Sequence, residues 1–595
     1  MNTTSSLQQL YTERLAEFTR HLKEKKRSLF FLSMVRLVTF LLLILFIYLF
    51  WGNLALLGIS LVLGISVFLF LLVKYQNLAV QKKQLEALIS INQTELNVLA
   101  GDYKNLPTGK IYSNALHHYS EDIDLFGKNS FYQYLNRTSL KEGSDKLADL
   151  LTANQTLNII EKQQAIAELS EKIDYRQEFS AKAKLVTTEV SNKSLLNWLE
   201  NYTPFIPKIH LWLPRVFGGI SILLLIAYFG GFISGYIPSG WFFVGLAITG
   251  SKLKKINLLG VYANESQKSF QQYYKLLALV EAQDFKADLL TELQEKLSSK
   301  NQKASEKLQQ FSKIIDAFEQ RNNMLFGVVG NGFLLWDLHY TYKLEKWISA
   351  NSKEVKQWFA VLETLDAYHS LGNFAFNHPN YCFPSLNSTN QHILEVKNTV
   401  HPLINTATAI TNSFTIAEEE FLIVTGANMA GKSTFLRTVS LLIVMANTGL
   451  PVRAESCNYK PIKLITSMRT SDSLADDSSY FFAELSRLKF LVEELKNNQY
   501  FIVLDEILKG TNSKDKAEGS EKFIEKLSKQ KATGIIATHD LSLCKLAERY
   551  PHIHNYYFDA EIINDELSFD YTLKKGVCKN MNASFLLRKM NIIDQ

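Results

Sequence analysis

Apolar residues collect in two long runs near the start of the chain. Positions 29–51 and 54–73 are almost entirely apolar, with Gly52 and Asn53 between them. Each run is close to the ~20 residues that a helix needs to cross a bilayer. Lysines and arginines cluster before the first run and after the second, so 29–75 is predicted to be a transmembrane hairpin with both ends in the cytoplasm.

A second apolar patch, residues 216–250, contains no charged side chain and has basic residues on both flanks. It is too long for one span and just long enough for two tight ones that turn near 234–239. We therefore expect a second transmembrane hairpin over 211–251, which gives four spans. The alternatives are one span with a re-entrant piece, which would put the soluble flanks on opposite faces, and buried core helices.

The remaining segments carry helical and then strand-like patterns. Residues 1–28 form a polar, basic helix, and apolar positions at helical spacing over 76–210 and 252–390 predict an all-α core in two parts. Alternating β-type segments begin near His392, so 391–595 is expected to be a C-terminal α/β domain. The predicted fold class is thus multidomain: transmembrane helices, an all-α core and a C-terminal α/β domain.

The strongest chemical signal lies where a buried strand turns into a helix. Residues 421–434, FLIVTGANMAGKST, fit G-x-x-x-x-G-K-[ST] with an apolar strand before and an apolar-periodic helix after, which is the context that a phosphate-binding loop requires. Backbone N–H groups at the helix start would face a polyphosphate. Lys432 would reach the β- and γ-phosphates, and Ser433 would bind Mg²⁺. An ordinary strand–helix turn is the competing interpretation; a nucleotide and Mg²⁺ are the expected ligands.

Two strand ends downstream supply further candidates. The apolar strand 501–504 ends at Asp505 and Glu506, at the sheet edge where doubly wound folds bind their ligands. Asp505 suits the Mg²⁺ shell, and Glu506 suits activation of an attacking water. The strand 534–538 ends at His539, which could sense the γ-phosphate, whereas a lone histidine is more often a structural hydrogen-bonder.

Composition and charge narrow the class of protein only slightly. The 595 residues leave room for several domains, and a net charge of +6 is too small at this length to indicate nucleic-acid binding. The four cysteines are scattered without metal-ligand spacing, which fits a reducing compartment without disulfides.

These motifs resemble one family, the MutS-type ATPases. The loop that this family usually writes GPNMGGKST is GANMAGKST here, and most other families with such a loop lack its Asn–Met pair. The resemblance continues in HPLI (401–404), VLDEILKGTNSKD (503–515) and ATHD (537–540), and reaches the helical core at 125–151 and 362–376. It implies that ATP is bound by Gly426, Ala427, Asn428, Met429, Ala430, Gly431, Lys432, Ser433 and Thr434.

The resemblance also implies a site shared between two copies of the chain. SSYFFAEL (478–485) is similar to a family signature in which a serine reaches the partner's ATP, and aligned on Glu484 that serine is Ser479. Taken alone, Ser479 would be interpreted as a helix N-cap. The family's scheme implies a homodimer through the ATPase domains, with Lys432, Glu506 and His539 as catalytic groups and Ser433 and Asp505 as Mg²⁺ ligands.

Departures from the family shape the functional expectation. No counterpart of the mismatch-reading N-terminal domain precedes the core, and the second apolar patch replaces the clamp region that grips DNA. Ala427 and Ala430 stand where the family loop has Pro and Gly. Ala430 is expected to fit if its φ is negative.

We therefore expect a membrane-anchored, ATP-hydrolysing dimeric switch in a bacterial-type inner membrane, with its soluble domains facing the cytoplasm. Three hypotheses compete for its partner: duplex DNA bound without mismatch selectivity, an unknown protein or lipid acted on by a membrane switch, and the cargo of an ATP-driven transporter. The transporter is weakest, because four short spans are few for a pathway and no L-S-G-G-Q-type signature precedes the acidic pair. The sequence shows no clear basic stripe with interleaved aromatic residues, so it does not decide between DNA and a protein or lipid partner.

Overall fold

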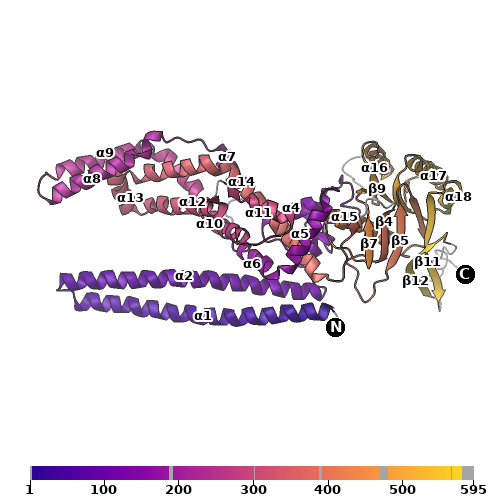
Figure 1. The fold of residues 1–595 in the computed structure, drawn as a ribbon, viewed down its shortest axis with the longest axis horizontal. Helices are drawn as coiled ribbons and strands as arrows, with labels where there is room; N and C mark the ends of the chain where they lie inside the picture. The colour runs from indigo at the N-terminus through magenta and orange to yellow at the C-terminus, as the bar shows by residue number, and fades with distance from the viewer. Residues whose placement is uncertain are drawn as a thin grey trace.

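The computed structural model describes residues 3–186, 192–299, 302–386, 392–469, 480–563 and 566–578. The molecule is elongated, with the strands gathered in a domain at one end and helices along the rest of its length (Figure 1). The two apolar hairpins lie at or point toward the end opposite the strands. The predicted combination of a helical body with a C-terminal α/β domain is therefore present.

The chain begins with two very long helices, α1 (Thr3–Leu49) and α2 (Leu54–Leu99), which pack against each other. Asn53 caps α2 by accepting a hydrogen bond from the Leu56 N–H at 3.2 Å. Each helix is continuous, so the polar helix predicted at 1–28 is an extension of the first apolar run. By length and composition alone, α1 and α2 are the two helices of the described chain that could cross a membrane, and only 6% of each apolar window is buried.

The second apolar patch also folds into a hairpin, but its arms are short. α8 (Leu213–Phe229) and α9 (Tyr236–Gly250) have 17 and 15 residues and are separated by residues 230–235. Gly231 takes a left-handed conformation (φ +77°) that ends α8, so the turn comes earlier than expected. Neither arm reaches the ~20 residues of a span. The predicted second hairpin is thus present as two short apolar helices, and its crossing of a membrane stays a prediction.

A third apolar helix, α13 (Met324–Leu334), packs against α8 and α9 and was not anticipated. Its 11 residues follow a region rich in Lys, Glu and Gln, and the run is too short to register as a span.

Helices predominate in the middle of the chain, as predicted, and α14 (Trp336–Asn377) is their axis. Its 42 residues make it about 63 Å long, and it runs from the apolar end to the domain with the strands (Figure 1). The neighbouring helices are α3 (Phe131–Leu135), α4 (Lys141–Thr152), α5 (Ile159–Glu171), α6 (Ile173–Ala183), α7 (Asn192–Asn201), α10 (Leu253–Glu281), α11 (Asp288–Glu295) and α12 (Ala304–Glu319), with a small ladder β1 (Ser298–Ser299) and β2 (Gln302–Lys303) before α12.

The C-terminal domain contains a six-stranded sheet in the order β12–β11–β6–β10–β9–β8, in which only β12 runs antiparallel to its neighbour. Alternate residues of β6 (Phe421–Gly426) face opposite sides: Leu422 and Val424 join the large core, while Phe421 and Ile423 pack with α16 and α17. The other elements are β8 (Lys463–Ser467), β9 (Tyr500–Asp505), β10 (Thr533–Ala537), β11 (Ile553–Ile563), β12 (Glu566–Lys575), α15 (Lys432–Thr448), α16 (Tyr480–Glu494), α17 (Ser513–Lys529) and α18 (Leu546–Arg549).

A second sheet of four strands links this domain to the helical core. Its order is β3–β7–β4–β5, and β4 begins at His392, where the strand-like pattern was predicted to start. The members are β3 (Ser385–Leu386), β4 (His392–Thr399), β5 (Asn412–Ala417) and β7 (Ser456–Tyr459).

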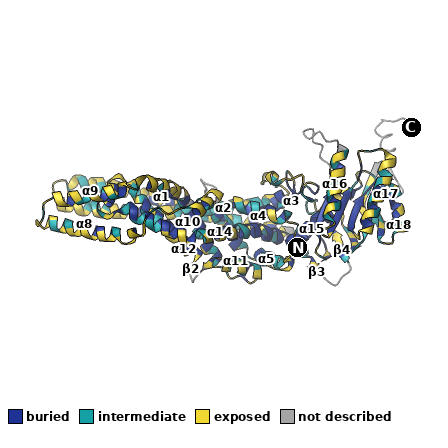
Figure 2. Cartoon of the chain, turned by 90° about the horizontal axis from the view of Figure 1, so that it is seen from above, coloured by how far each residue is buried: buried dark blue, intermediate teal, exposed yellow. Residues whose placement is uncertain are grey.

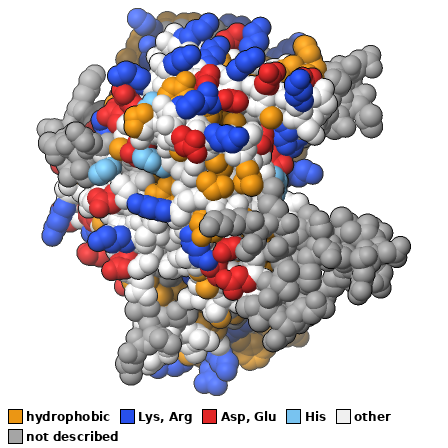
Figure 3. Space-filling view, turned by 90° about the vertical axis from the view of Figure 1, so that its right-hand side faces the viewer, with side chains coloured by type: hydrophobic (Ala, Val, Ile, Leu, Met, Phe, Trp, Pro, Cys, Tyr) orange, Lys and Arg blue, Asp and Glu red, His pale blue; other side chains and the backbone are white. Residues whose placement is uncertain are grey.

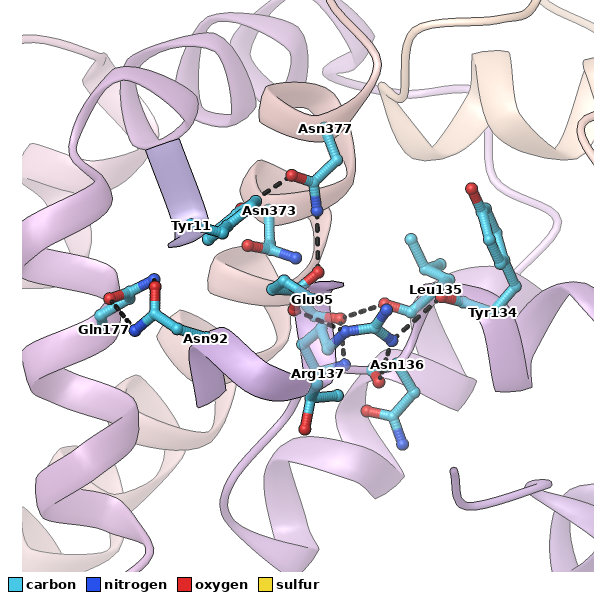
Figure 4. A network of polar contacts seen from close by, with 12 residues as sticks. Tyr11, Asn92, Glu95, Tyr134, Leu135, Asn136, Arg137, Gln177, Asn373 and Asn377 are labelled. Carbon is cyan, nitrogen blue, oxygen red and sulfur yellow. Dashed lines mark hydrogen bonds and ion pairs between the residues drawn. The ribbon is translucent and has the colours of Figure 1, made fainter. Parts of the chain in front are cut away.

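A buried polar network ties the N-terminal hairpin to the end of α14 (Figure 4). Glu95 of α2, whose side chain is 3% exposed, accepts from Arg137 Nε at 2.7 Å and from Asn377 Nδ2 at 2.9 Å. Tyr11 of α1 donates from its hydroxyl to Asn377 Oδ1 at 2.7 Å. Because Asn377 is the last residue of α14, the hairpin is bonded to the point where the core passes into the domain with the strands. We call these four residues, Tyr11, Glu95, Arg137 and Asn377, the hairpin joint.

Candidate active site

The predicted phosphate-binding loop connects β6 to α15 at the carboxyl edge of the six-stranded sheet. Its backbone is left-handed at Gly426 (φ +149°), Met429 (φ +67°) and Gly431 (φ +106°). A Cβ on Gly426 would lie 2.6 Å from the Phe558 carbonyl oxygen, so this position requires glycine. Ala430 is fully buried and is not among the positive-φ residues, which confirms the condition under which alanine was expected to fit.

Lys432, the first residue of α15, is 6% exposed and held inside the loop. Its Nζ donates to the carbonyl oxygens of Gly426 at 2.8 Å and Ala427 at 2.9 Å. Burial lowers the pKa of Lys432, and the negative charges of Glu506 and Asp505 oppose that effect. A buried ammonium whose hydrogen bonds go to neutral carbonyls gains a stronger partner when a polyphosphate enters.

Ser433 and Asp505 meet across the loop. Ser433 Oγ donates to Asp505 Oδ2 at 2.7 Å, which joins the start of α15 to the end of β9. These are the oxygen ligands that Mg²⁺ takes from a protein, and Mg²⁺ usually needs only one or two of them beside phosphate oxygens and water. The two residues therefore fit the metal ion that the sequence predicted.

Glu506 and His539 join the ends of β9 and β10. His539 Nε2 lies 2.6 Å from Glu506 Oε1, and the hydrogen bond lowers the pKa of Glu506 to about 2, with Lys509 and Lys516 adding to the effect against burial. The Glu506 backbone is left-handed (φ +50°), and its N–H donates to the Ala537 carbonyl at 2.9 Å. Such conformations cost about 1–3 kcal/mol and collect at functional sites. Glu506 is thus a fixed, ionised carboxylate.

A cavity of about 620 Å³ opens beside the loop, a size typical of ligand sites. Met429, although largely exposed, forms part of its rim. The predicted residues that line this cavity are Asn428, Met429, Gly431, Lys432, Ser433, Thr434, Asp505 and Glu506. Gly426, Ala427 and Ala430 shape the loop without lining the cavity, and His539 reaches it through Glu506. Ser479 lies outside the described residues.

The far wall of the cavity was missed by sequence reasoning. Val400, Ile404 and Ile410 supply apolar surface from the segment between β4 and β5, and Tyr571 of β12 adds an aromatic ring. Such a wall suits the base of a nucleotide whose phosphates lie on the loop. The motif HPLI was the available signal, because it precedes the strand β5 and matches the family, but it was not assigned a role.

Comparisons with known proteins agree with the geometry. The family model of MutS domain V matches residues 422–589, which include the loop, the Asp505–Glu506 pair and His539. "MutS protein homolog 4" of Homo sapiens is 28% identical over 258 residues, 41% of this chain and 27% of that protein. "DNA mismatch repair protein MutS" of Halothermothrix orenii is 30% identical over 251 residues, 40% of this chain and 28% of that protein.

These matches are confined to part of each protein. The chain spans only about a quarter of the length of the curated relatives it matches, with 27% and 28% of them covered. The matched region, residues 422–589, contains the loop, the acidic pair and the histidine. On that ground residues 422–589 form a domain of the MutS family, its domain V.

Proposed function

We propose that this protein is an ATP hydrolase that works as a dimeric conformational switch anchored in a membrane. One observation carries the enzymatic part: Lys432, the Ser433–Asp505 pair and Glu506 border a single cavity next to the phosphate-binding loop. The match of residues 422–589 to MutS domain V supports this assignment, because the sequence resemblance to MutS-type ATPases implies ATP as the ligand of the same loop.

Each side chain has a distinct role in the proposed reaction. Lys432 and the N–H groups at the start of α15 hold the phosphates. Glu506, ionised at neutral pH, accepts a hydrogen bond from the water that attacks the γ-phosphorus, and His539 keeps that carboxylate in place. Because His539 Nε2 also lies 3.4 Å from Lys432 Nζ, it connects the base to the phosphate-binding lysine. Mg²⁺ bound at Ser433 and Asp505 would neutralise charge on the β- and γ-phosphate oxygens.

The dimer is proposed from the resemblance of 478–485, in which Ser479 would complete the neighbour's site. The described part of that motif is consistent: Glu484 is 4% exposed and accepts from the Lys509 N–H at 3.0 Å. This bond fixes the start of α16 beside the loop that follows Glu506. A structural change at the ATP site would thus be transmitted to the start of α16, next to the segment that would meet the partner chain.

Membrane anchoring is proposed from α1 and α2. Their outward apolar side chains are exposed over nearly the whole of both runs, and a lipid bilayer is the surrounding that would cover them. Basic residues before residue 28 and after residue 73 support a two-pass arrangement with the core and the ATPase domain in the cytoplasm, in a bacterial-type inner membrane.

Two partners remain candidates for the switch. Relatives named for DNA mismatch repair support duplex DNA, bound without mismatch selectivity. A protein or lipid partner without any DNA role is favoured by the apolar character of the far end of the molecule. On the visible face of the ATPase end, Lys and Arg are interspersed with Asp and Glu and form no continuous basic stripe (Figure 3).

The test of the enzymatic proposal compares two variants. Lys432→Ala is expected to abolish ATP binding, whereas Glu506→Gln is expected to retain binding and to lower turnover by about 100-fold or more, within the range for a general base. Lys489→Ala, an exposed lysine on α16, is the matched control and should change neither. Binding of a fluorescent ATP analogue and phosphate release are measured on the detergent-solubilised protein. Loss of ATP binding in both site variants would show that Glu506 has a structural role. Unchanged turnover in both would show that this cavity is not the site of hydrolysis.

A further inference from the structure

The far end of the molecule holds an apolar helix that the proposed function does not use. α13 leaves Met324 83%, Leu325 79% and Val329 52% exposed. No charged residue lies between Arg321 and Asp337. The exposed sides of α8 and α9 are equally apolar, and exposed residues cover this end in Figure 2. A continuous apolar surface of this kind marks an interaction site. We call α8, α9 and α13 together the apolar head.

Inside the head, the helices pack as helices do in lipid. A Cβ on Gly245 of α9 would lie 2.2 Å from the Gly332 carbonyl oxygen of α13, so the two backbones are in close contact. Ser221 of α8 accepts from Trp241 Nε1 at 2.9 Å and donates to the Phe333 carbonyl at 2.6 Å. Small residues at the contact and polar groups that satisfy one another are the features that membrane helix packing favours.

The helices of the head are shorter than the hydrocarbon core of a bilayer is thick. At 1.5 Å per residue, α8, α9 and α13 are about 26, 22 and 16 Å long, against about 30 Å of hydrocarbon. Its turn is apolar as well: Phe229, Phe232 and Tyr236 are 82%, 84% and 89% exposed, and no charged residue lies between them. A turn that emerged into water on the opposite side would need no such side chains.

The base of the head carries positive charge. The chain has no acidic residue between Glu200 and Glu265. Each lysine or arginine near an anionic membrane surface contributes about 1 kcal/mol of attraction. Anionic lipid headgroups therefore complement this base better than the mixed charge of a typical protein surface. The basic residues at the two ends of the α8–α9 hairpin are Lys208, Arg215, Lys252, Lys254 and Lys255.

The head and the turn between α1 and α2 lie at the same end of the long axis (Figures 1 and 2). We propose that the apolar head inserts into the bilayer that α1 and α2 cross. It enters from the face on which α1 begins and α2 ends, and it does not cross, so that α8, α9 and α13 are embedded in lipid. The basic residues at the two ends of the α8–α9 hairpin then bind anionic headgroups at that face. The proposal rests on the membrane anchoring proposed above. As a consequence, α14 connects a membrane-embedded head at one end of the helical body to the ATPase domain at the other end.

Lipid contact is tested with a fluorophore on single added cysteines in vesicles that contain anionic lipid and nitroxide-labelled acyl chains. The native cysteines stay, since Cys457, Cys544 and Cys578 are buried and Cys382 is half-buried, and the unsubstituted protein gives the background. Leu325→Cys in α13 should be quenched several-fold more than Leu116→Cys, an exposed site (83%) on the core, and about as much as Leu42→Cys in α1.

The outcomes separate the head from the anchor. Quenching at Leu42 without quenching at Leu325 would overturn the head proposal and leave the anchor standing. Quenching at neither site would overturn both. A disulfide-linked dimer through Leu325→Cys without quenching would assign the surface to a second copy of the chain and also overturn the proposal.

Insertion without crossing is tested by labelling with a membrane-impermeant maleimide on sealed vesicles. Phe232→Cys at the turn of the head should stay unlabelled from both sides and become reactive when detergent is added. Gly52→Cys in the turn between α1 and α2, where a Cβ meets nothing within 4 Å, should be labelled from the face opposite to Leu116→Cys. Labelling of Phe232→Cys from the Gly52 face would show that the hairpin crosses, and labelling from the Leu116 face would show that it is not embedded.

Discussion

His539 Nε2 lies 2.6 Å from Glu506 Oε1, so a hydrogen bond joins the residues that follow two neighbouring strands of the sheet, β10 and β9. The hydrogen bond is the largest cause of the low pKa of Glu506, about 2. The proposed base, Glu506, is therefore ionised at every pH at which the protein is expected to work. Its low pKa depends on His539, which lies more than thirty positions away in the chain.

Removing the histidine should change the pH dependence of turnover. In His539→Ala the pKa of Glu506 is expected to rise from about 2 toward its ordinary value of 4.5, because the hydrogen bond is lost. A depressed carboxyl pKa keeps the charged form to lower pH. The wild-type rate should therefore not fall through protonation of Glu506 above about pH 4, whereas the variant's residual rate should fall as the pH drops toward 4.5. The measurement is the kcat profile from about pH 4 to pH 9. An unchanged acid limb would contradict the pairing.

The hairpin joint should contribute more stability than surface charges on the same helix. Arg137→Ala leaves the buried Glu95 carboxylate without its ion pair, which is expected to cost about 3–5 kcal/mol. Lys82→Ala removes an exposed i,i+4 pair with Glu86 on α2 and should cost at most about 0.5 kcal/mol. Thermal unfolding in detergent compares the two variants. Equal effects would show that the joint is not buried in solution.

Sequence reasoning located the elements of the candidate site because their signal is local. The loop 421–434 needs a strand before it and a helix after it, and both are apparent from nearby residues. The acidic pair and His539 end apolar strands, so parallel order alone places them at one edge of the sheet. Even the substitution at Ala430 could be judged, since one backbone angle decides it.

What the sequence did not show depends on contacts between distant segments. Val400 and Tyr571 face the same cavity although 171 positions separate them, and no local pattern in the sequence brings the two together. Glu95 and Asn377 form one joint from two ordinary polar positions on long helices. The second hairpin was judged by its total length, which does not locate the glycine turn that sets the length of each arm. The apolar helix α13 has only 11 residues, about half of what a membrane-spanning helix needs.

The role of Ser479 in a shared site can be tested by mixing variants. If Ser479 reaches the partner's ATP, a Ser479→Ala protein mixed with a Lys432→Ala protein forms heterodimers in which one composite site carries both changes and the other carries neither. Partial turnover should then return, reaching a maximum near equal amounts. Turnover that follows the weighted average of the two separate proteins at every ratio would favour a helix cap.

Any binding to DNA should be electrostatic and blind to mismatches. Reading a mismatch requires a side chain that inserts at a destabilised step and a clamp that holds the bent duplex, and the chain shares only about a quarter of the length of relatives named for that task. Affinities for perfect and mismatched duplexes are expected to differ by less than about 1 kcal/mol and to fall steeply with salt. Competition assays with and without ATP measure this. A tenfold preference for the mismatched duplex, about 1.4 kcal/mol, would contradict this prediction and favour a role in mismatch repair.

The central claim is that ATP closes a dimer of this chain and that hydrolysis reopens it. The most direct measurement is the mass of the detergent-solubilised Glu506→Gln protein by light scattering, without nucleotide, with ADP and with ATP, beside Lys432→Ala. The account predicts that ATP shifts Glu506→Gln to a long-lived dimer, that ADP does so much less, and that Lys432→Ala does not respond to ATP. A Glu506→Gln protein that binds ATP and keeps the same mass in all three conditions would contradict it.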